Sequence, residues 1–395
     1  MRDEPDEFGT AVAGIAAFVA AAADPACSTL FPTCPSAHDT NPLSLGFGAS
    51  GVLWALDASG VPLRPGWKEW LRERLDAVDP ATYPGGLMNG LAGLAWTSDE
   101  LGFRGQARTL LALANRRAAE SGDHTFYYGL AGVGMTNLRF YVRGHDERDL
   151  AAALDCARAL RETVRHDGEH AYWLDEFNKV SEFDKVGEFD GFSANGALTG
   201  LGLGQAGVAM FLLRMYQVTG DESHLRLGRA ALAWELAQAR LVDGMPVFEH
   251  EGAREPHVEV GGAGIARVLL RYGGLDDARA VLRALDAGRS GLPGCGSGMA
   301  GLADALLDAA EITGDRTYRE TALRRLDLVR GTFLSEPAAR PGPLRGDGSA
   351  RLGVSGEDLP RCACDYLTGS AGVLRVLHRA HHGCPADFLL DEVSR

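Results

Sequence analysis

The sequence is short of aromatic residues, of positive charge and of long apolar runs. Aromatic side chains make up 8% of the 395 residues, and the formal net charge is −14. An acidic chain is poorly suited to the phosphates of nucleic acids and to anionic membrane surfaces, since both attract basic patches. No stretch reaches the ~18 consecutive apolar residues of a membrane-spanning helix. We therefore expect neither nucleic acid nor a membrane as a partner.

Signals for secretion are also missing. The longest run of small apolar residues, Ala11 to Ala23, follows acidic residues rather than the basic start of a signal peptide, and we predict a core-packing helix there. The seven cysteines are odd in number in a long chain, which is not the pattern of a disulfide framework. These features predict a protein of the reducing cytoplasm.

Glycine, by contrast, is abundant. There are 51 glycines, nearly twice the usual share of ~7%. A repeat accounts for much of this excess: glycine, any residue, a small residue, glycine and an aliphatic residue. Its seven copies begin at Gly48, Gly90, Gly129, Gly204, Gly261, Gly298 and Gly369. One copy would be weak evidence, but seven copies indicate an architecture built from repeats.

The residues after each motif have the spacing of helices rather than the alternation of strands. Thr-Gly-Asp at 219–221 and at 313–315 predicts helix ends, with more polar helices to follow over Glu222–Leu241 and Arg316–Thr332. Each repeat is therefore predicted to be a glycine-rich loop, an apolar inner helix, a turn and a polar outer helix. Because an open solenoid would expose the apolar inner helices, we predict a closed ring.

Two regions interrupt the repeats. A hexapeptide pattern places Glu-Phe at 176, 182 and 188, and its period suits neither helix nor strand. It predicts an inserted loop at about 175–192, near the mouth of the ring. Residues 335–361 are rich in proline, glycine, arginine and aspartate and predict a loop before the last repeat. With these two loops, residues 1–395 are expected to form a single domain.

The glycine motifs and their helical hairpins resemble the lanthionine synthetase C-like family over nearly the whole chain. Four segments are most similar to the cyclase domain of class III lanthipeptide synthetases: Leu30-Phe31-Pro32, Leu45–Leu56, Tyr127–Gly134 and Asp387–Leu390. The resemblance implies an all-α fold, an α/α toroid in which seven hairpins form a double ring of helices. It also implies kinase and lyase domains as partners. Neither is present in these 395 residues, so we expect either an excised domain or a stand-alone relative.

The resemblance further implies a lanthipeptide cyclase. Such an enzyme adds cysteine thiols of a dehydrated precursor peptide to dehydroalanine or dehydrobutyrine, which forms lanthionine thioether rings. Some class III enzymes also close a carbon–carbon bond to give labionin, and the sequence leaves both products open. The addition needs a thiolate and a proton donor for the enolate that follows. Dehydroamino acids react with thiols unaided, so positioning the peptide would supply part of the acceleration.

The zinc-dependent relatives activate the thiol with ligands that this sequence lacks. Laid on the glycine motifs, their first cysteine falls on Glu259 and their Cys-His pair on Gly296 and Ser297. Their histidine before the fourth motif falls on Leu203, and their third-repeat aspartate falls on Thr125. Zinc sites in proteins are built from Cys, His and carboxylate ligands. We therefore expect no zinc and no other cofactor, as the class III resemblance also implies.

Candidate catalytic residues remain near the same loops. His257, Glu259, Tyr128 and Asp365 are the predicted acid–base groups, and the alternative for each is a solvated residue at the rim. Cys295, Cys364 and His257 precede neighbouring motifs and form an alternative, shifted metal site. Otherwise these thiols are small apolar packing residues.

Two other functions fit parts of the pattern. A non-catalytic scaffold would bind the precursor peptide and support the kinase and lyase domains, and the missing zinc ligands favour it. An unrelated α/α-toroid enzyme is disfavoured. A glycosidase needs two carboxylates that flank the bond, and a class I terpene cyclase needs an aspartate-rich motif on a helix; neither stands out here.

Overall fold

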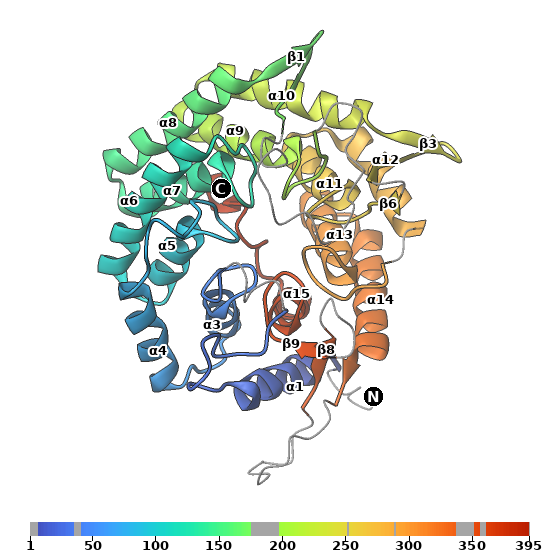
Figure 1. The fold of residues 1–395 in the computed structure, drawn as a ribbon. Helices are drawn as coiled ribbons and strands as arrows, with labels where there is room; N and C mark the ends of the chain where they lie inside the picture. Colours follow the sequence, from blue (N-terminus) through green and yellow to red (C-terminus); the bar gives the residue numbers. More distant parts are fainter. Residues whose placement is uncertain are drawn as a thin grey trace.

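The fold is a double ring of helices in which each glycine motif starts an inner helix (Figure 1). The computed structural model describes residues 7–34, 41–174, 197–250, 253–287, 290–336, 351–355 and 361–394. The inserted loop predicted at about 175–192 lies outside these residues, as does most of the loop predicted at 335–361.

The inner ring is closed. Its helices each follow directly after the first glycine of a motif, and every neighbouring pair is in contact, including the last helix with the first. They are α3 (Ala49–Ala58), α5 (Leu91–Glu100), α7 (Leu130–Gly144), α9 (Gln205–Thr219), α11 (Gly262–Arg271), α13 (Met299–Thr313) and α15 (Ser370–His382). The prediction of a ring rather than an open solenoid is confirmed.

The outer ring covers the inner one. Six outer helices each follow their inner helix: α4 (Pro65–Asp76), α6 (Arg104–Ser121), α8 (Glu147–Thr163), α10 (Glu222–Ala237), α12 (Leu275–Ala287) and α14 (Arg316–Phe333). The seventh position is filled differently from the predicted hairpin. There α1 (Glu7–Ala22) packs on α15, so the first helix of the chain completes the last repeat.

Turns between inner and outer helices follow the predicted chemistry. Gly220 and Gly314 end α9 and α13 in the left-handed conformation, with φ of 71° and 72°. Asp221 and Asp315 then cap the next helices, because each carboxylate accepts a hydrogen bond from a backbone N–H in the first turn. The helix predicted to reach Leu241 ends instead at Ala237, and Leu241 belongs to a strand.

Short strands lie in the connections between the helices, and the sequence patterns did not predict them. They form two-residue and three-residue pairings in the connections, all antiparallel: β1 (Arg165–Asp167) with β2 (His170–Tyr172), β3 (Arg240–Val242) with β4 (Met245–Val247), β5 (Glu249–His250) with β6 (Ala253–Arg254), and β7 (Leu334–Ser335) with β8 (Gly353–Ser355) and β9 (Cys362–Ala363). No helix in the described ranges has the length and apolar character needed to cross a bilayer.

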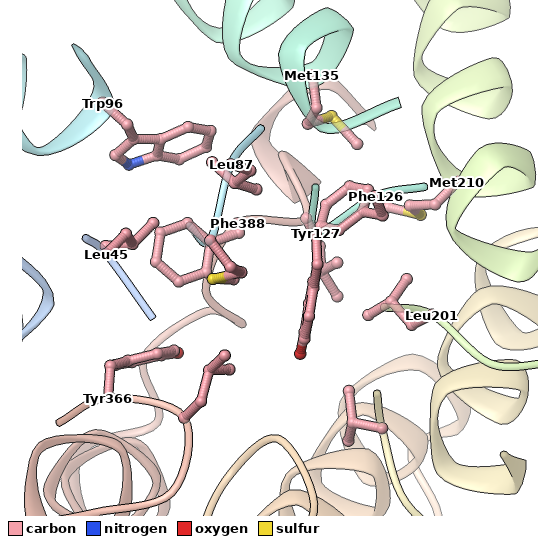
Figure 2. Close-up of a cluster of buried hydrophobic side chains, with 14 of the residues drawn as sticks. Leu45, Leu87, Trp96, Phe126, Tyr127, Met135, Leu201, Met210, Tyr366 and Phe388 are labelled. Atoms are coloured by element: carbon pink, nitrogen blue, oxygen red, sulfur yellow. The ribbon is translucent and has the colours of Figure 1, made fainter. Parts of the chain in front are cut away.

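Side chains fill the interior of the ring. Figure 2 shows residues of the inner helices and of their preceding loops, such as Phe126, Met135 and Leu201, converging with Phe388. Phe388 belongs to the segment Asp387–Ser394, called the strap here, which follows α15 and crosses the ring to α9 (Figure 1). Its ring packs against Trp54, Trp96 and Tyr366 at centroid distances of 4.8, 5.2 and 5.5 Å.

The second glycine of each motif allows the inner helix to start against its own loop. At Gly51, a Cβ atom would lie 1.8 Å from the carbonyl oxygen of Leu45. The same clash would occur at Gly93 with the Leu87 oxygen, at 1.9 Å, and at Gly372 with the Tyr366 oxygen, at 1.9 Å. The repeated spacing of the motif is therefore a steric requirement that recurs around the ring.

Gly51→Ala should destabilise the protein by about 1–3 kcal/mol or more, because backbone must move to admit the methyl group. Gly105→Ala is the matched control, since Gly105 also lies in the first turn of a helix and its added Cβ would meet nothing within 4 Å. We expect that control to be neutral or to stabilise by about 0.5–1 kcal/mol. Urea unfolding measures both, and equal effects would refute the steric explanation.

A candidate active site at the loop end of the ring

A closed circle of backbone hydrogen bonds joins the seven loops. Its members are the residues two positions before each motif: Gly46, Met88, Tyr127, Gly202, Glu259, Gly296 and Leu367. In that order, each N–H donates to the carbonyl oxygen of the next residue, and Leu367 donates to Gly46, with N···O distances between 2.7 and 3.2 Å. Because each loop bonds to both neighbours, these seven residues are held at one end of the inner ring.

Glu259 is the only carboxylate in this circle and its only half-buried member; the other six are buried. The next residue of every loop is also half-buried: Phe47, Asn89, Tyr128, Leu203, Val260, Ser297 and Thr368. These positions line the mouth of the ring. Glu259 therefore places a carboxyl group at this mouth.

Two hydroxyl groups from other repeats hold the Glu259 carboxylate. The Ser297 hydroxyl donates to Oε2 over 2.9 Å, and the Tyr128 hydroxyl lies 3.5 Å from Oε1. The two partners come from the loops before α13 and α7, so the group combines three repeats. The predicted residues Glu259 and Tyr128 are thus brought together. Ser297 was missed as a functional candidate, although its place on the histidine position of the zinc enzymes was a usable signal.

Two other ionisable groups, Tyr127 and Cys295, belong to the loops joined by the circle. Tyr127 and the Cα atom of Glu259 both lie beside Gly202. Burial raises the pKa of the Tyr127 phenol well above its usual value, and the charge of Glu259 raises it further. Burial likewise raises the pKa of the Cys295 thiol well above 9. Both groups therefore stay protonated, and uncharged, at neutral pH.

His257 is directed elsewhere. Its Nδ1 lies 2.7 Å from Oε2 of Glu255, and its Nε2 lies 3.0 Å from Oγ of Ser290. Both ring nitrogens are therefore occupied by partners other than Glu259. His257 therefore stabilises the loop that leads to Glu259. It does not join Ser297 and Tyr128 as a partner of the Glu259 carboxylate.

Asp365 is buried rather than placed at the mouth. Its Oδ1 accepts hydrogen bonds from the backbone N–H groups of Thr368 and Gly369, at 2.8 and 3.0 Å, and from the Thr368 hydroxyl at 2.8 Å. It therefore caps the loop that starts α15. Burial raises the pKa of this carboxyl to about 6, while these hydrogen bonds partly oppose the rise.

A raised pKa in the folded state makes stability fall as the pH rises from about 4 to about 6, because the unfolded chain loses the Asp365 proton first. Asp365→Asn removes this pH-dependent contribution to the free energy of unfolding. We expect the variant to gain up to about 3 kcal/mol relative to wild type over that window, and no more above pH 7. Asp155→Asn, an exposed change on α8, is the control. Urea unfolding from pH 4 to 7.5 measures the difference, and a pH-independent difference would contradict the buried-cap assignment.

The residues present do not fit a zinc ion. The zinc positions of the related enzymes hold one carboxylate, Glu259, beside Ser297, Gly296 and Leu203. The alternative metal set is not assembled either: Cys295 donates its thiol to the carbonyl oxygen of Tyr366 at 3.0 Å, and Cys364 is buried. In the described part of the chain, no three His, Cys, Asp or Glu side chains are grouped to hold a metal ion.

Known proteins share both the sequence pattern and the fold. A model of the family "Lanthionine synthetase C-like protein" matches residues 69–325. The probable SapB synthase of Streptomyces coelicolor is 30% identical over 396 residues, which cover 97% of this chain and 39% of that protein. The chain thus spans about two fifths of the length of this curated relative.

Two solved structures show the fold alone. Nisin cyclase superposes with a TM-score of 0.60 and 16% identity, covering 90% of this chain and 92% of its own. An inactive variant of an α-1,6-mannanase from Salegentibacter sp. HEL1_6 superposes with a TM-score of 0.51 and 13% identity, covering 95% and 99%. The ring is thus the α/α toroid of nisin cyclase. Together with the family match, these findings show that the chain belongs to the lanthionine synthetase C-like family.

Proposed function

We propose that this chain is a lanthipeptide cyclase of the class III type that works without zinc. Its substrate is a precursor peptide in which serine or threonine has been dehydrated. The observation that carries the proposal is the Glu259 carboxylate, held by Ser297 and Tyr128 at the mouth of a lanthionine synthetase C-like toroid. Laid on the glycine motifs, Glu259 falls on the position of the first cysteine ligand of the zinc-dependent relatives.

The reaction adds an S–H bond across a C=C bond and needs no oxidant or reductant. Glu259 accepts the thiol proton as the sulfur attacks the β-carbon of the dehydro residue. The new C–S bond forms, the π pair moves onto the amide as an enolate, and the α-carbon then takes a proton from Glu259. Because a carboxylate is a weaker base than a thiolate, the transfer is uphill until the sulfur bonds. Holding the two reacting side chains together supplies the rest of the acceleration.

The hydroxyl groups serve as positioning residues in this mechanism. Ser297 and Tyr128 donate to different carboxylate oxygens and so fix the plane of the Glu259 carboxylate. A fixed carboxylate can receive a proton on one side of the substrate and return it to a defined face of the α-carbon. The configuration of the new stereocentre would follow from this geometry.

The proposed partners are the kinase and lyase domains that dehydrate the peptide, in the same polypeptide or supplied separately. The matching relative in Streptomyces coelicolor is much longer than this chain, which is consistent with further domains. The product is lanthionine, or labionin if a carbon–carbon bond also closes. Acid hydrolysis and mass spectrometry of the product separate the two.

Ring-closure kinetics test the proposal. A synthetic peptide with one dehydroalanine and one cysteine is incubated with and without the protein, and remaining thiol is counted by alkylation and mass spectrometry. We expect faster thiol loss with the protein, and one diastereomer of lanthionine. Peptide binding without acceleration would support the scaffold reading instead.

A further inference from the structure

A cavity lies beside the loop that carries Glu259. It encloses about 370 Å³ between the β3–β4 hairpin, α12 and the start of α11. Its walls include Met245, Val247, Phe248, Val281 and Leu285. Ligand pockets in proteins start at about 300 Å³, so this one suits a single large side chain rather than a folded peptide.

The cavity borders the loop that leads to the mouth. A smaller cavity of about 70 Å³ also uses Phe248 as a wall and is bounded by Val260, the residue after Glu259. On the other side, Glu255 and Pro256 line the larger cavity and directly precede His257. The loop from Glu255 to Val260 therefore borders both cavities and also carries the Glu259 carboxylate.

The chemistry of the lining selects an apolar group. Phe248, Val281 and Leu285 are at most 3% exposed and form the deep wall. Gly262 closes the floor, since a Cβ there would lie 3.3–3.4 Å from these same three side chains. The Glu255 carboxylate, which could repel an apolar group, is paired with His257 at 2.7 Å. Arg254 and Asp243 stand at the exposed edge.

A main-chain partner is available for an extended peptide at this place. The β3–β4 and β5–β6 sheets each have two strands in the described part of the chain. Extended peptides commonly bind along such strand edges while one side chain enters a pocket. Figure 1 places β3 and β6 beside α12 on the same side of the ring.

We propose that this cavity is a specificity subsite that receives a leucine-like or phenylalanine-like side chain of the substrate peptide, next to the residues that react at Glu259. The inference rests on the proposed function for the identity of the peptide, and it names the substrate feature that the site selects. Peptides with an apolar residue near the ring-forming cysteine bind in preference to peptides with an acidic residue there.

Methionine NMR tests the subsite without any ring closure. Met245 lines the cavity, whereas Met135 and Met210 lie in the core. With methyl-labelled methionine, the probes are N-acetyl methylamides of phenylalanine, leucine and aspartate. We expect the phenylalanine and leucine probes to shift the Met245 signal and to leave Met135 and Met210 unchanged, and the aspartate probe to shift none of them. An unmoved Met245 signal, or an equal response to aspartate, would overturn the proposal.

Filling the cavity gives the matched variant. Ala284→Phe places a ring among the lining residues on α12 and should abolish the Met245 response. Ala151→Phe adds the same ring on the exposed face of α8 and should leave it intact. If Ala284→Phe does not fold, the selectivity of the wild-type protein among the three probes decides alone. Because binding is measured, failure of the subsite is distinguishable from failure of the cyclase proposal, which appears only in ring-closure rates.

Discussion

Replacing Glu259 by glutamine is expected to slow ring closure by about 10²–10⁴-fold, the range typical of a lost general acid–base group. Glutamine keeps the size of the side chain and an oxygen that can accept from Ser297 or Tyr128, so the fold should be unaffected. The rate is measured as thiol loss on a dehydrated peptide, at saturating peptide, to separate chemistry from binding. The carboxylate is the only one in the hydrogen-bonded circle of loops, so no neighbour in that circle can replace it.

Matched variants separate a catalytic from a structural role. Glu222→Gln makes the same change on the exposed surface of α10 and should leave the rate unchanged. Ser297→Ala and Tyr128→Phe each remove one hydroxyl from Glu259 and should cost less than Glu259→Gln, with a mixture of diastereomers as the added signature. If Glu259→Gln binds peptide and closes rings at the wild-type rate, Glu259 is not the acid–base group and the scaffold reading gains support.

Phe388→Ala should destabilise the protein by about 3–5 kcal/mol, the usual cost of truncating a buried phenylalanine. Phe388 is 6% exposed and packs against three aromatic rings from α3, α5 and the last loop. Its loss would leave a cavity among the side chains that fill the interior of the ring. The free energy of unfolding in urea measures the effect, and Glu392→Ala, an exposed change in the same strap, should stay within about 0.5 kcal/mol.

Ion pairs explain why the strap is held so firmly. Asp387 pairs with Arg375 at 2.9 Å and accepts from the Tyr366 hydroxyl at 3.0 Å. Asp391 pairs with Arg214 on α9 at 2.5 Å and with Arg271 on α11 at 2.6 Å. Arg214 and Arg375 are almost fully buried and would lose these carboxylate partners without the strap, whereas Arg271 also pairs with Asp308 at 2.6 Å. If Phe388→Ala had the same free energy of unfolding as Glu392→Ala, the strap would not be part of the stabilising core of the ring.

Much of the fold followed from local pattern. The glycine motifs predicted the inner helices because each needs a residue without Cβ where its first turn meets a carbonyl a few residues earlier, as Gly51 meets Leu45. The Thr-Gly-Asp turns predicted helix ends because a left-handed glycine and an aspartate cap are local requirements. Both features depend on residues close together in the chain, and spacing alone reports them.

The candidate site was only partly predictable. The motif register placed Glu259 and Tyr128 just before the fifth and third motifs, and their side chains meet across the intervening Gly202 loop although 131 residues separate them. The same spacing predicted Asp365 and His257 as acid–base groups alongside Glu259. Whether a side chain two to four residues before a motif faces the mouth, caps a loop or turns to a neighbour depends on contacts that spacing does not encode.

The sequence by itself determined the repeated inner helices and predicted their closure into a ring, because the glycine motifs and helix patterns depend on residue type at local spacing. Only the tertiary structure decided that α1 completes the last repeat, that the strap fills the ring and that Ser297 holds Glu259. Each of those is a pairing between distant segments. Such pairings are selected by the burial of apolar surface and charge in the assembled ring, and neither exists until the ring has closed.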